Sequence, residues 1–253
     1  MRPILATLRS AGRSLGEGLL HLFYPRVCWV CQQIQPPGQP AICGDCASQF
    51  TRDDRPTCPR CASTVGPYVE LANGCSSCRA SPLAFDQAFR LAPYEGLLKE
   101  TILRMKQPNG EGLAEAVADF WADRLAERLR PLAPDVVLPV PLHWLRQWRR
   151  GFNASEVLAR ALAARLKAPC RPGWLRRCRR TEQQKEFPPA ETAKRWENVN
   201  RAFAVRSGAD LAGKTIVLVD DVLTTGATAS EAARPMRALK PKSIIAAVVA
   251  HGR

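Results

Sequence analysis

The stretch IVLVDDVLTTGATASE, at residues 216–231, decides the fold of the C-terminal part of this chain. Its first four residues are apolar and mostly β-branched, which is typical of a strand buried on both faces of a parallel sheet. Two aspartates, a Thr/Gly turn and the start of a helix near Ala227 follow in that order. The stretch therefore predicts a strand, a tight loop and a helix, with polar groups gathered where the strand ends.

The loop has the chemistry of a phosphate site. A helix N-terminus presents unpaired backbone N–H groups and a dipole that favours an anion, and a glycine lets the backbone close around it. The residues predicted to hold the phosphate are Thr224, Thr225, Gly226, Ala227 and Thr228. Asp220 and Asp221 before them are acceptors suited to two ribose hydroxyls or to a hydrated Mg²⁺. Together they predict a pocket for a phosphorylated ribose.

A second phosphate motif is present but stands in the wrong context. GADLAGKT, at residues 208–215, matches the P-loop pattern letter for letter. A P-loop follows a strand and opens a helix, whereas this one leads straight into the strand at 216–219. The sequence also lacks G-x-G-x-x-G. Nucleoside triphosphate hydrolysis and dinucleotide binding are therefore not expected.

Eight of the ten cysteines form four C-x-x-C pairs in the N-terminal third of the chain. The eight are Cys28, Cys31, Cys43, Cys46, Cys58, Cys61, Cys75 and Cys78. The spacing predicts two tetrahedral Cys₄ zinc sites, formed in sequence order or, as the alternative, cross-braced. Four protein ligands on each ion leave no open position for catalysis, so the zinc is expected to be structural.

The cysteine-rich segment, residues 25–79, has few large apolar side chains, so zinc is expected to supply its folding energy. Such ribbons also serve as docking surfaces for nucleic acid or protein. Thiols rather than disulfides suit a reducing compartment, and no apolar run approaches the roughly 18 residues of a membrane span. Residues 1–24 have helix-like apolar spacing but too short an apolar run for a signal peptide. A cytoplasmic protein without a transmembrane segment is expected.

Positive charge is concentrated in one segment. Residues 144–206 hold 16 Lys/Arg against five Asp/Glu, which is +11 of the formal net charge of +14. Two zinc–tetrathiolate sites would each add −2, which brings the loaded protein to about +10. Trp144, Trp148, Trp174 and Trp196 are interleaved with the arginines. A basic segment with aromatic residues favours a polyanionic partner, either pyrophosphate or single-stranded nucleic acid.

Strand and helix patterns alternate in the rest of the chain. Strands are predicted at residues 89–93, 136–140, 202–205, 216–219 and 244–249, and helices at 96–105, 112–130, 153–166 and 227–239. A long polar loop is predicted at 176–191. Alternation predicts an α/β fold whose mostly parallel sheet binds ligands beyond the carboxyl ends of its strands. The turn PVPL after residue 138 and the DDVLTTGAT loop are expected to face one crevice.

The assembled motifs resemble the ComF family of bacterial proteins over nearly the full length. The resemblance is carried by the four C-x-x-C pairs, the PVPL turn, RRGFN at 149–153, the R-x-R-x-T-x-x-Q spacing at 177–184, RxxN at 195–198 and VDDVLTTGAT. It implies a type I phosphoribosyltransferase-like sheet with helices on both faces, preceded by a small zinc-ribbon module. The implied parts are a helical segment at 1–24, a double zinc ribbon at 25–82 and a phosphoribosyltransferase-like domain at 83–253.

The resemblance also implies a ligand and a role. It implies that Asp220 and Asp221 contact the ribose of phosphoribosyl pyrophosphate with Mg²⁺, that residues 224–228 hold its 5-phosphate, and that the turn after Val140 lies near the pyrophosphate. It implies a part in handling single-stranded DNA during uptake, with competence-machinery proteins as partners. We assign Arg149, Arg150 and Arg177 to the pyrophosphate or another polyanion, because cationic side chains stabilise a leaving group of that charge.

Two functions remain open from the sequence. The first is a protein that binds a phosphoribosyl ligand and single-stranded DNA. The second is an active phosphoribosyltransferase acting on an unknown nucleophile. Thr224 stands where 6-oxopurine transferases have a general-base aspartate, so purine salvage of that type is not expected. The sequence shows no separate segment that would recognise a base, and no catalytic residue is assigned.

Overall fold

The computed structural model of the chain describes residues 25–72, 74–179 and 192–252. These residues form two compact units, one ending at Ser48 and the other running from Gln49. The expectations for residues 1–24 and for most of the loop at 176–191 lie outside the described residues. Within the part of the chain described, no helix is both long and apolar enough to cross a lipid bilayer.

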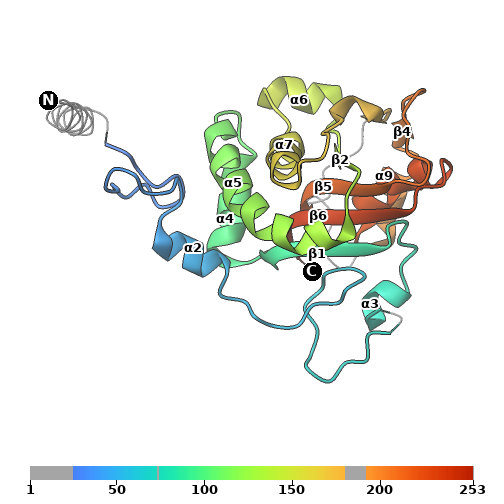
Figure 1. Cartoon of the computed structure of the whole chain (residues 1–253), viewed down its shortest axis with the longest axis horizontal. Helices are drawn as coiled ribbons and strands as arrows, with labels where there is room; N and C mark the ends of the chain where they lie inside the picture. The colour runs from blue at the N-terminus through green and yellow to red at the C-terminus, as the bar shows by residue number, and fades with distance from the viewer. Residues whose placement is uncertain (1–24, 73, 180–191, 253) are drawn as a thin grey trace, which may run out of the picture. The chain divides into compact units, whose positions relative to one another are not determined.

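A four-stranded parallel sheet forms the centre of the larger unit (Figure 1). Its order is β1-β6-β5-β2, and its strands are β1 (Gln87–Pro93), β2 (Val136–Pro139), β5 (Thr215–Leu223) and β6 (Ser243–His251). The middle strands are buried almost throughout, as the apolar runs predict. The predicted parallel sheet is confirmed, and β5 lies at its centre between β2 and β6.

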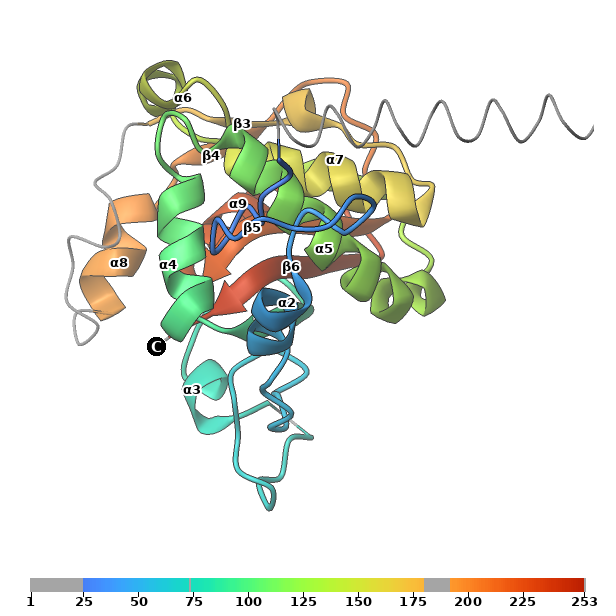
Figure 2. The same ribbon diagram turned by 90° about the vertical axis from the view of Figure 1, so that its left-hand side faces the viewer.

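Helices cover both faces of the sheet, as predicted (Figure 2). On one face α7 (Ala154–Leu166) packs on β2 and β5, while α5 (Glu111–Leu129) packs on β1 and on α7. The indole of Trp121 on α5 is fully buried and donates to the carbonyl oxygen of Val248 at 2.8 Å. On the other face lies α9 (Ala227–Arg237). α4 (Gly96–Met105) packs against α5.

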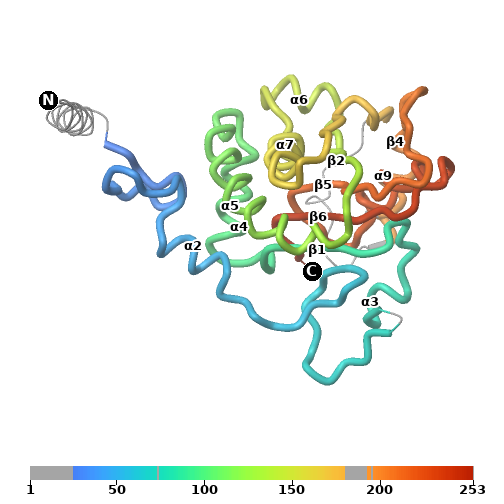
Figure 3. Tube along the Cα trace, in the orientation of Figure 1, coloured from blue at the N-terminus to red at the C-terminus, as the bar shows by residue number. Residues whose placement is uncertain are grey.

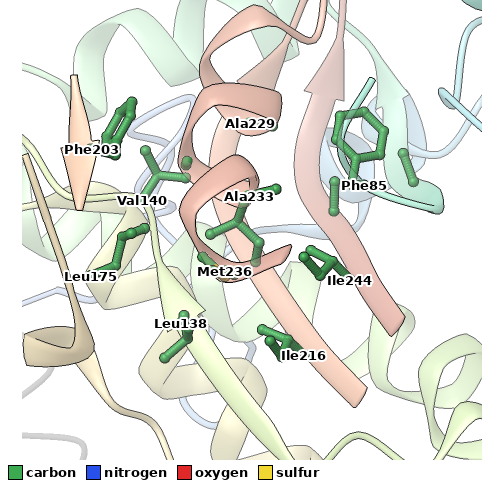
Figure 4. Packing of buried hydrophobic residues seen from close by; sticks show 14 of the residues in the cluster. Phe85, Leu138, Val140, Leu175, Phe203, Ile216, Ala229, Ala233, Met236 and Ile244 are labelled. Carbon is green, nitrogen blue, oxygen red and sulfur yellow. The ribbon is translucent and has the colours of Figure 1, made fainter. Parts of the chain in front are cut away.

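The core under α9 joins the sheet to the segment that precedes it. Figure 4 shows Ala229, Ala233 and Met236 of α9 between Phe203 on one side and Phe85 on the other. Small side chains on this helix let it approach β5 and β6 closely, and Met236 is fully buried. The N-terminus of α9 is thereby held at the carboxyl end of β5, where the phosphate loop lies.

Two expectations about residues 176–205 are wrong. Strand β4 (Phe203–Val205) does not join the central sheet but pairs antiparallel with β3 (Leu175–Arg177) in a separate sheet of two strands. The predicted polar loop therefore starts after Arg177 rather than at Arg176. Leu175 and Phe203 are buried, and their burial holds this hairpin against the core below α9.

Other short elements were not predicted. They are α6 (Trp144–Arg150), α8 (Thr192–Val199) and the 3₁₀ turns Arg130–Leu132 and Pro172–Trp174. α6 has no buried residue, so no apolar period marks it in the sequence. Its ends are set instead by caps. His143 accepts a hydrogen bond from the amide of Leu145, and Gly151 ends the helix with a φ of +88°.

The two cysteine-rich segments repeat one local fold (Figure 3). In each, the first cysteine of the tetrad donates its amide to a carbonyl five residues on, Cys28 to Gln33 and Cys58 to Ser63, both at 2.9 Å. Each ends in a short helix, α2 (Gly44–Phe50) or α3 (Ser76–Arg79). The second ribbon belongs to the unit that contains the sheet, because that unit begins at Gln49.

Strand β1 is an edge strand whose outer side is partly covered by the second ribbon. The amide of Ala88 donates to the carbonyl oxygen of Pro59 at 3.2 Å, while β6 pairs with the other side of the strand. Next to this bond the guanidinium of Arg90, only 4% exposed, donates to Thr64 at 2.6 Å and to Asp53 at 3.1 Å. The ribbon is therefore bound to the sheet by backbone and side-chain hydrogen bonds.

Candidate functional site

The two aspartates lie inside strand β5 rather than after it, at the end where the strand leaves the sheet. Asp220 Oδ1 accepts hydrogen bonds from the hydroxyl of Ser155 and from the amide of Asp221, both at 2.9 Å. Asp221 Oδ1 accepts from the ammonium group of Lys106 at 2.8 Å. Both carboxylates are half-buried. They are thus fixed by residues of α7 and by the residue that follows α4.

The electrostatics of the pair are unusual for two acids. Burial and, second, the neighbouring Asp221 carboxylate raise the pKa of Asp220 to about 7, although Lys106 and the Ser155 hydrogen bond act against this rise. A carboxylate held in this way gains from any cation or hydroxyl donor that reaches it. Half-buried carboxylates beside a phosphate loop fit Mg²⁺, which binds proteins through one or two carboxylates together with phosphate oxygens of its ligand.

Cationic side chains from three elements face the aspartates. Besides Lys106, the guanidinium of Arg150 is half-buried within range of Asp221, and burial lowers its pKa. Burial, Arg146 and Arg179 lower the pKa of Arg177 to about 10, while Asp220 opposes this shift. Both arginines keep their charge at neutral pH. Positive charge converging on a carboxylate pair is what a ligand with several phosphate groups and ribose hydroxyls would meet.

The turn after β2 is held next to this charge cluster. The amide of Val140 donates to the carbonyl oxygen of Val219 at 2.8 Å, and the carbonyl of Val140 accepts from the side chain of Asn153 at 3.1 Å. Asn153 also caps α7 by accepting from the amide of Ser155 at 3.2 Å. One asparagine therefore joins the PVPL turn to the helix whose Ser155 holds Asp220. The expected shared crevice is what this geometry provides.

The phosphate loop turns at Gly226, whose φ of +79° is left-handed. A Cβ atom there would lie 2.7 Å from a methyl of Leu83, so glycine is required by both conformation and space. The threonines at 224, 225 and 228 are half-buried, so their hydroxyls stay within reach of a ligand. The first turn of α9 contains no acidic residue to compete with an anion.

The eight cysteines form two groups in sequence order, so the cross-braced alternative is not what the structure has. In each group the sulfur atoms lie within 4.8 Å of one another. Neighbouring sulfur atoms are separated by 3.8–3.9 Å in the first group and by 3.6–3.8 Å in the second. A tetrahedral zinc ion with Zn–S of about 2.3 Å requires sulfurs about 3.8 Å apart. The residues therefore fit a structural zinc ion at each tetrad.

The structure brings most of the predicted site residues together. Asp220, Asp221, Arg150 and Arg177 gather around the end of β5, next to the loop at 224–228. Arg149 is different, because it is exposed on α6 beside the exposed Trp148. Its assignment to pyrophosphate is therefore less well supported by the geometry than its assignment to a larger polyanion.

Sequence reasoning missed three residues of the site: Lys106, Ser155 and Asn153. Lys106 reaches Asp221 across 115 positions of sequence, and Ser155 reaches Asp220 across 65. Contacts at such separations leave no local pattern. The only signal was for Asn153, a residue type that caps helices, at the start of the predicted helix.

Comparisons with known proteins agree with this geometry. Residues 153–253 match the family model described as phosphoribosyl transferase domain, and residues 19–80 match the double zinc ribbon domain. DNA utilization protein YhgH of Shigella flexneri is 32% identical over 216 residues, which cover 84% of this chain and 91% of that protein. Competence protein F of Haemophilus influenzae is 28% identical over 235 residues, covering 88% of this chain and 95% of that protein.

Fold and site together define a phosphoribosyltransferase-type α/β domain that carries a double zinc ribbon at its N-terminal side. Competence protein ComFC of Bacillus subtilis, 27% identical over 219 residues and 84% of each chain, is a further relative. The chain belongs to the ComF family.

Proposed function

We propose that the crevice at the end of β5 binds phosphoribosyl pyrophosphate, or a related phosphoribosyl ligand, together with Mg²⁺. The observation that carries the proposal is the convergence of two carboxylates, three cationic side chains and a helix N-terminus on one end of one strand. The aspartates would hold the ribose hydroxyls or Mg²⁺, the loop at 224–228 the 5-phosphate, and Arg150 and Arg177 the pyrophosphate. Mg²⁺ would neutralise charge between the phosphates and the acids.

Single-stranded DNA is the proposed second ligand. Trp144 and Trp148 are 70% and 78% exposed, and four residues apart on α6 they lie on the same side of the helix. Exposed indoles beside Arg149 offer a surface on which bases stack while the arginine meets phosphates. Relatives named for competence and DNA utilization support a role for this chain in handling DNA during uptake, with proteins of that machinery as partners. We propose that it acts in the cytoplasm.

Calorimetry with phosphoribosyl pyrophosphate and Mg²⁺ tests the first part. We expect saturable binding that Asp221→Asn weakens by about tenfold or more, because a charge-assisted contact contributes about 1.5–3 kcal/mol. Asp210→Asn, which changes an exposed aspartate whose ion-pair partner is Lys214, is the matched control and should bind as the parent does. Absence of saturable binding by the parent protein would refute the phosphoribosyl assignment.

Salt dependence tests the DNA part. The slope of log K against log salt should fall by about 0.7 for every phosphate of a single strand that the protein no longer neutralises. Arg149→Ala with Trp148→Ala should weaken a short oligonucleotide and flatten the slope. Lys242→Ala, which removes one exposed charge just before the amino end of β6, should leave the slope unchanged. Equal slopes for all proteins would remove α6 from the DNA site, and competition between oligonucleotide and phosphoribosyl pyrophosphate would place both in one crevice.

Phosphoribosyl transfer is the second candidate. The observation that favours it is the burial of Arg150 and Arg177 near the acids, since stabilising the pyrophosphate leaving group is the main demand of that reaction. Release of pyrophosphate, measured with candidate acceptors and abolished in Arg177→Met, would establish turnover. Tight binding with no release for any acceptor tested would favour the binding role.

A further inference from the structure

A cavity of about 410 Å³ lies between the phosphate loop and the second zinc ribbon, within the unit that starts at Gln49. Thr224, Thr225 and Gly226 form one wall, and the ribbon residues Ser63 and Ser77 form another. Asp220 and Asp221 do not line it. The cavity is therefore a compartment beside the proposed phosphoribosyl crevice, and its size is that of sites for small organic molecules.

The walls of the cavity carry no cationic side chain that would hold an anion. None of its described lining residues is Lys, Arg, Asp or Glu. Two of them, Cys61 and Cys78, belong to the second tetrad, and a tetrathiolate zinc centre has a net charge of −2. Phosphate and carboxylate ligands would be repelled there, because negative charge stands in the wall without compensation.

The uncharged groups that remain suit a flat ring with polar edges. Leu83, Phe85 and Leu223 supply apolar surface. Hydroxyls of serines and threonines and the imidazole of His251 supply donors and acceptors around it. Ser63 places His251 by a contact of 3.3 Å between Oγ and Nε2, and it also reaches Cys61 Sγ at 3.2 Å. A few convergent polar groups on an apolar surface are what orient a small heterocycle.

We propose that this cavity binds a neutral nitrogen heterocycle of the nucleobase class, with the second zinc ribbon as its outer wall. The inference rests on the proposed function in one respect, namely that the neighbouring loop holds a phosphoribosyl group. The ribbon then provides the base-recognition segment that the sequence of the α/β domain does not show. Zinc acts there through the shape and charge of the wall, without touching the reacting atoms.

Calorimetry on the zinc-loaded full chain tests the proposal with uracil, adenine and orotate as probes. Orotate is uracil with an added carboxylate, so the pair isolates the effect of charge. We expect saturable binding of uracil or adenine and at least about tenfold weaker binding of orotate, a difference of about 1.4 kcal/mol. No saturable binding of either neutral base, or orotate binding as tightly as uracil, would overturn the proposal.

Two neighbouring serines of α3 provide a matched pair of variants. Ser77 lines the cavity, whereas Ser76 beside it is exposed and does not. Ser77→Phe should fill the space and weaken the neutral base by at least about tenfold, while Ser76→Phe should change it less than about twofold. Equal effects of the two would overturn the assignment to this cavity. If Ser77→Phe loses zinc, Ala80→Trp, at an exposed lining position, replaces it in the same comparison.

Phosphoribosyl pyrophosphate is titrated in the same series, with and without a base present. Base binding in a protein that does not bind phosphoribosyl pyrophosphate would refute the proposed function and keep the cavity. The opposite result would refute the cavity and keep the proposed function.

Discussion

The first and second zinc ribbons have the same hydrogen-bond pattern but very different surroundings. In each, an amide donates to a cysteine sulfur at 3.3 Å, Cys43 to Cys28 and Cys75 to Cys58. In the first tetrad Cys31 is exposed and Cys43 is half-buried, whereas all four cysteines of the second are buried. The second tetrad touches Ser63, and through it the end of β6. One metal fold thus serves as a separate module in one case and as part of an α/β domain in the other.

The largest expected effect comes from removing one zinc ligand from each ribbon. Cys58→Ser should cost the larger unit several kcal/mol, because structural zinc provides folding energy, and should lower its midpoint of thermal unfolding by about 10 °C. Cys28→Ser should also remove one zinc per chain but leave that midpoint within about 2 °C. Zinc content and calorimetric scans check both. Equal shifts for the two variants would contradict the distinction between the ribbons.

The buried ion pair beside the second ribbon comes next. Arg90→Met leaves Asp53 without its buried partner and should destabilise the larger unit by about 3 kcal/mol. Arg55 binds the same aspartate but its side chain is 54% exposed, so Arg55→Met should cost less than about 1 kcal/mol. Denaturant unfolding of both variants measures the difference. A similar cost for the two would mean that the ribbon is only loosely attached to β1.

The pH dependence of stability should also separate the two units, because Asp220 belongs to the larger one. Its pKa is about 7 in the folded state against 3.8 as the ordinary value, so the folded state binds more protons between these values. Stability is then greatest below about pH 4 for this group and falls as the pH rises to about 7, by about 2 kcal/mol after allowance for solvent.

Asp220→Asn should remove that slope from the larger unit and raise its stability at pH 8, as measured by denaturant unfolding in a pH series. The variant Asp210→Asn, at an exposed aspartate, serves as control and should keep the slope. A slope that survives in Asp220→Asn would assign the titration to another group.

The smallest effect tests the link between the second ribbon and β6. Ser63→Ala removes the side-chain interactions with Cys61 and His251 and should cost about 1 kcal/mol. Gln33 holds the equivalent position in the first ribbon, where its carbonyl accepts from Cys28, so Gln33→Ala should cost the larger unit nothing measurable. Urea unfolding monitored through Trp121 resolves the two, and an effect of Gln33→Ala on that transition would link the ribbons.

Much of the fold could be predicted because its signals are local. The apolar run at 216–219 and the helix patterns at 96–105 and 153–166 correspond to β5, α4 and α7 within a few residues. α6 could not be found, because its tryptophans and arginines are exposed and have no core-facing period. The strand at 203–205 was recognised but misplaced, since three residues do not show which strand they pair with.

The candidate site was predictable to a similar extent. Residues 220–228 stand out because strand, acids and loop are contiguous. Their partners Lys106 and Ser155 come from distant helices, and the cavity behind the loop depends on how the second ribbon meets the sheet. Neither arrangement has a sequence period, because both depend on tertiary packing.

The bond between Ala88 and Pro59 has a consequence for the protein outside its function. An uncovered edge strand is a template on which other chains add by β-pairing. The second ribbon lies along that edge of β1 only while its tetrad holds the local fold. A cell short of zinc would therefore leave the sheet with an open side, and the protein would aggregate before its ligand affinity declined.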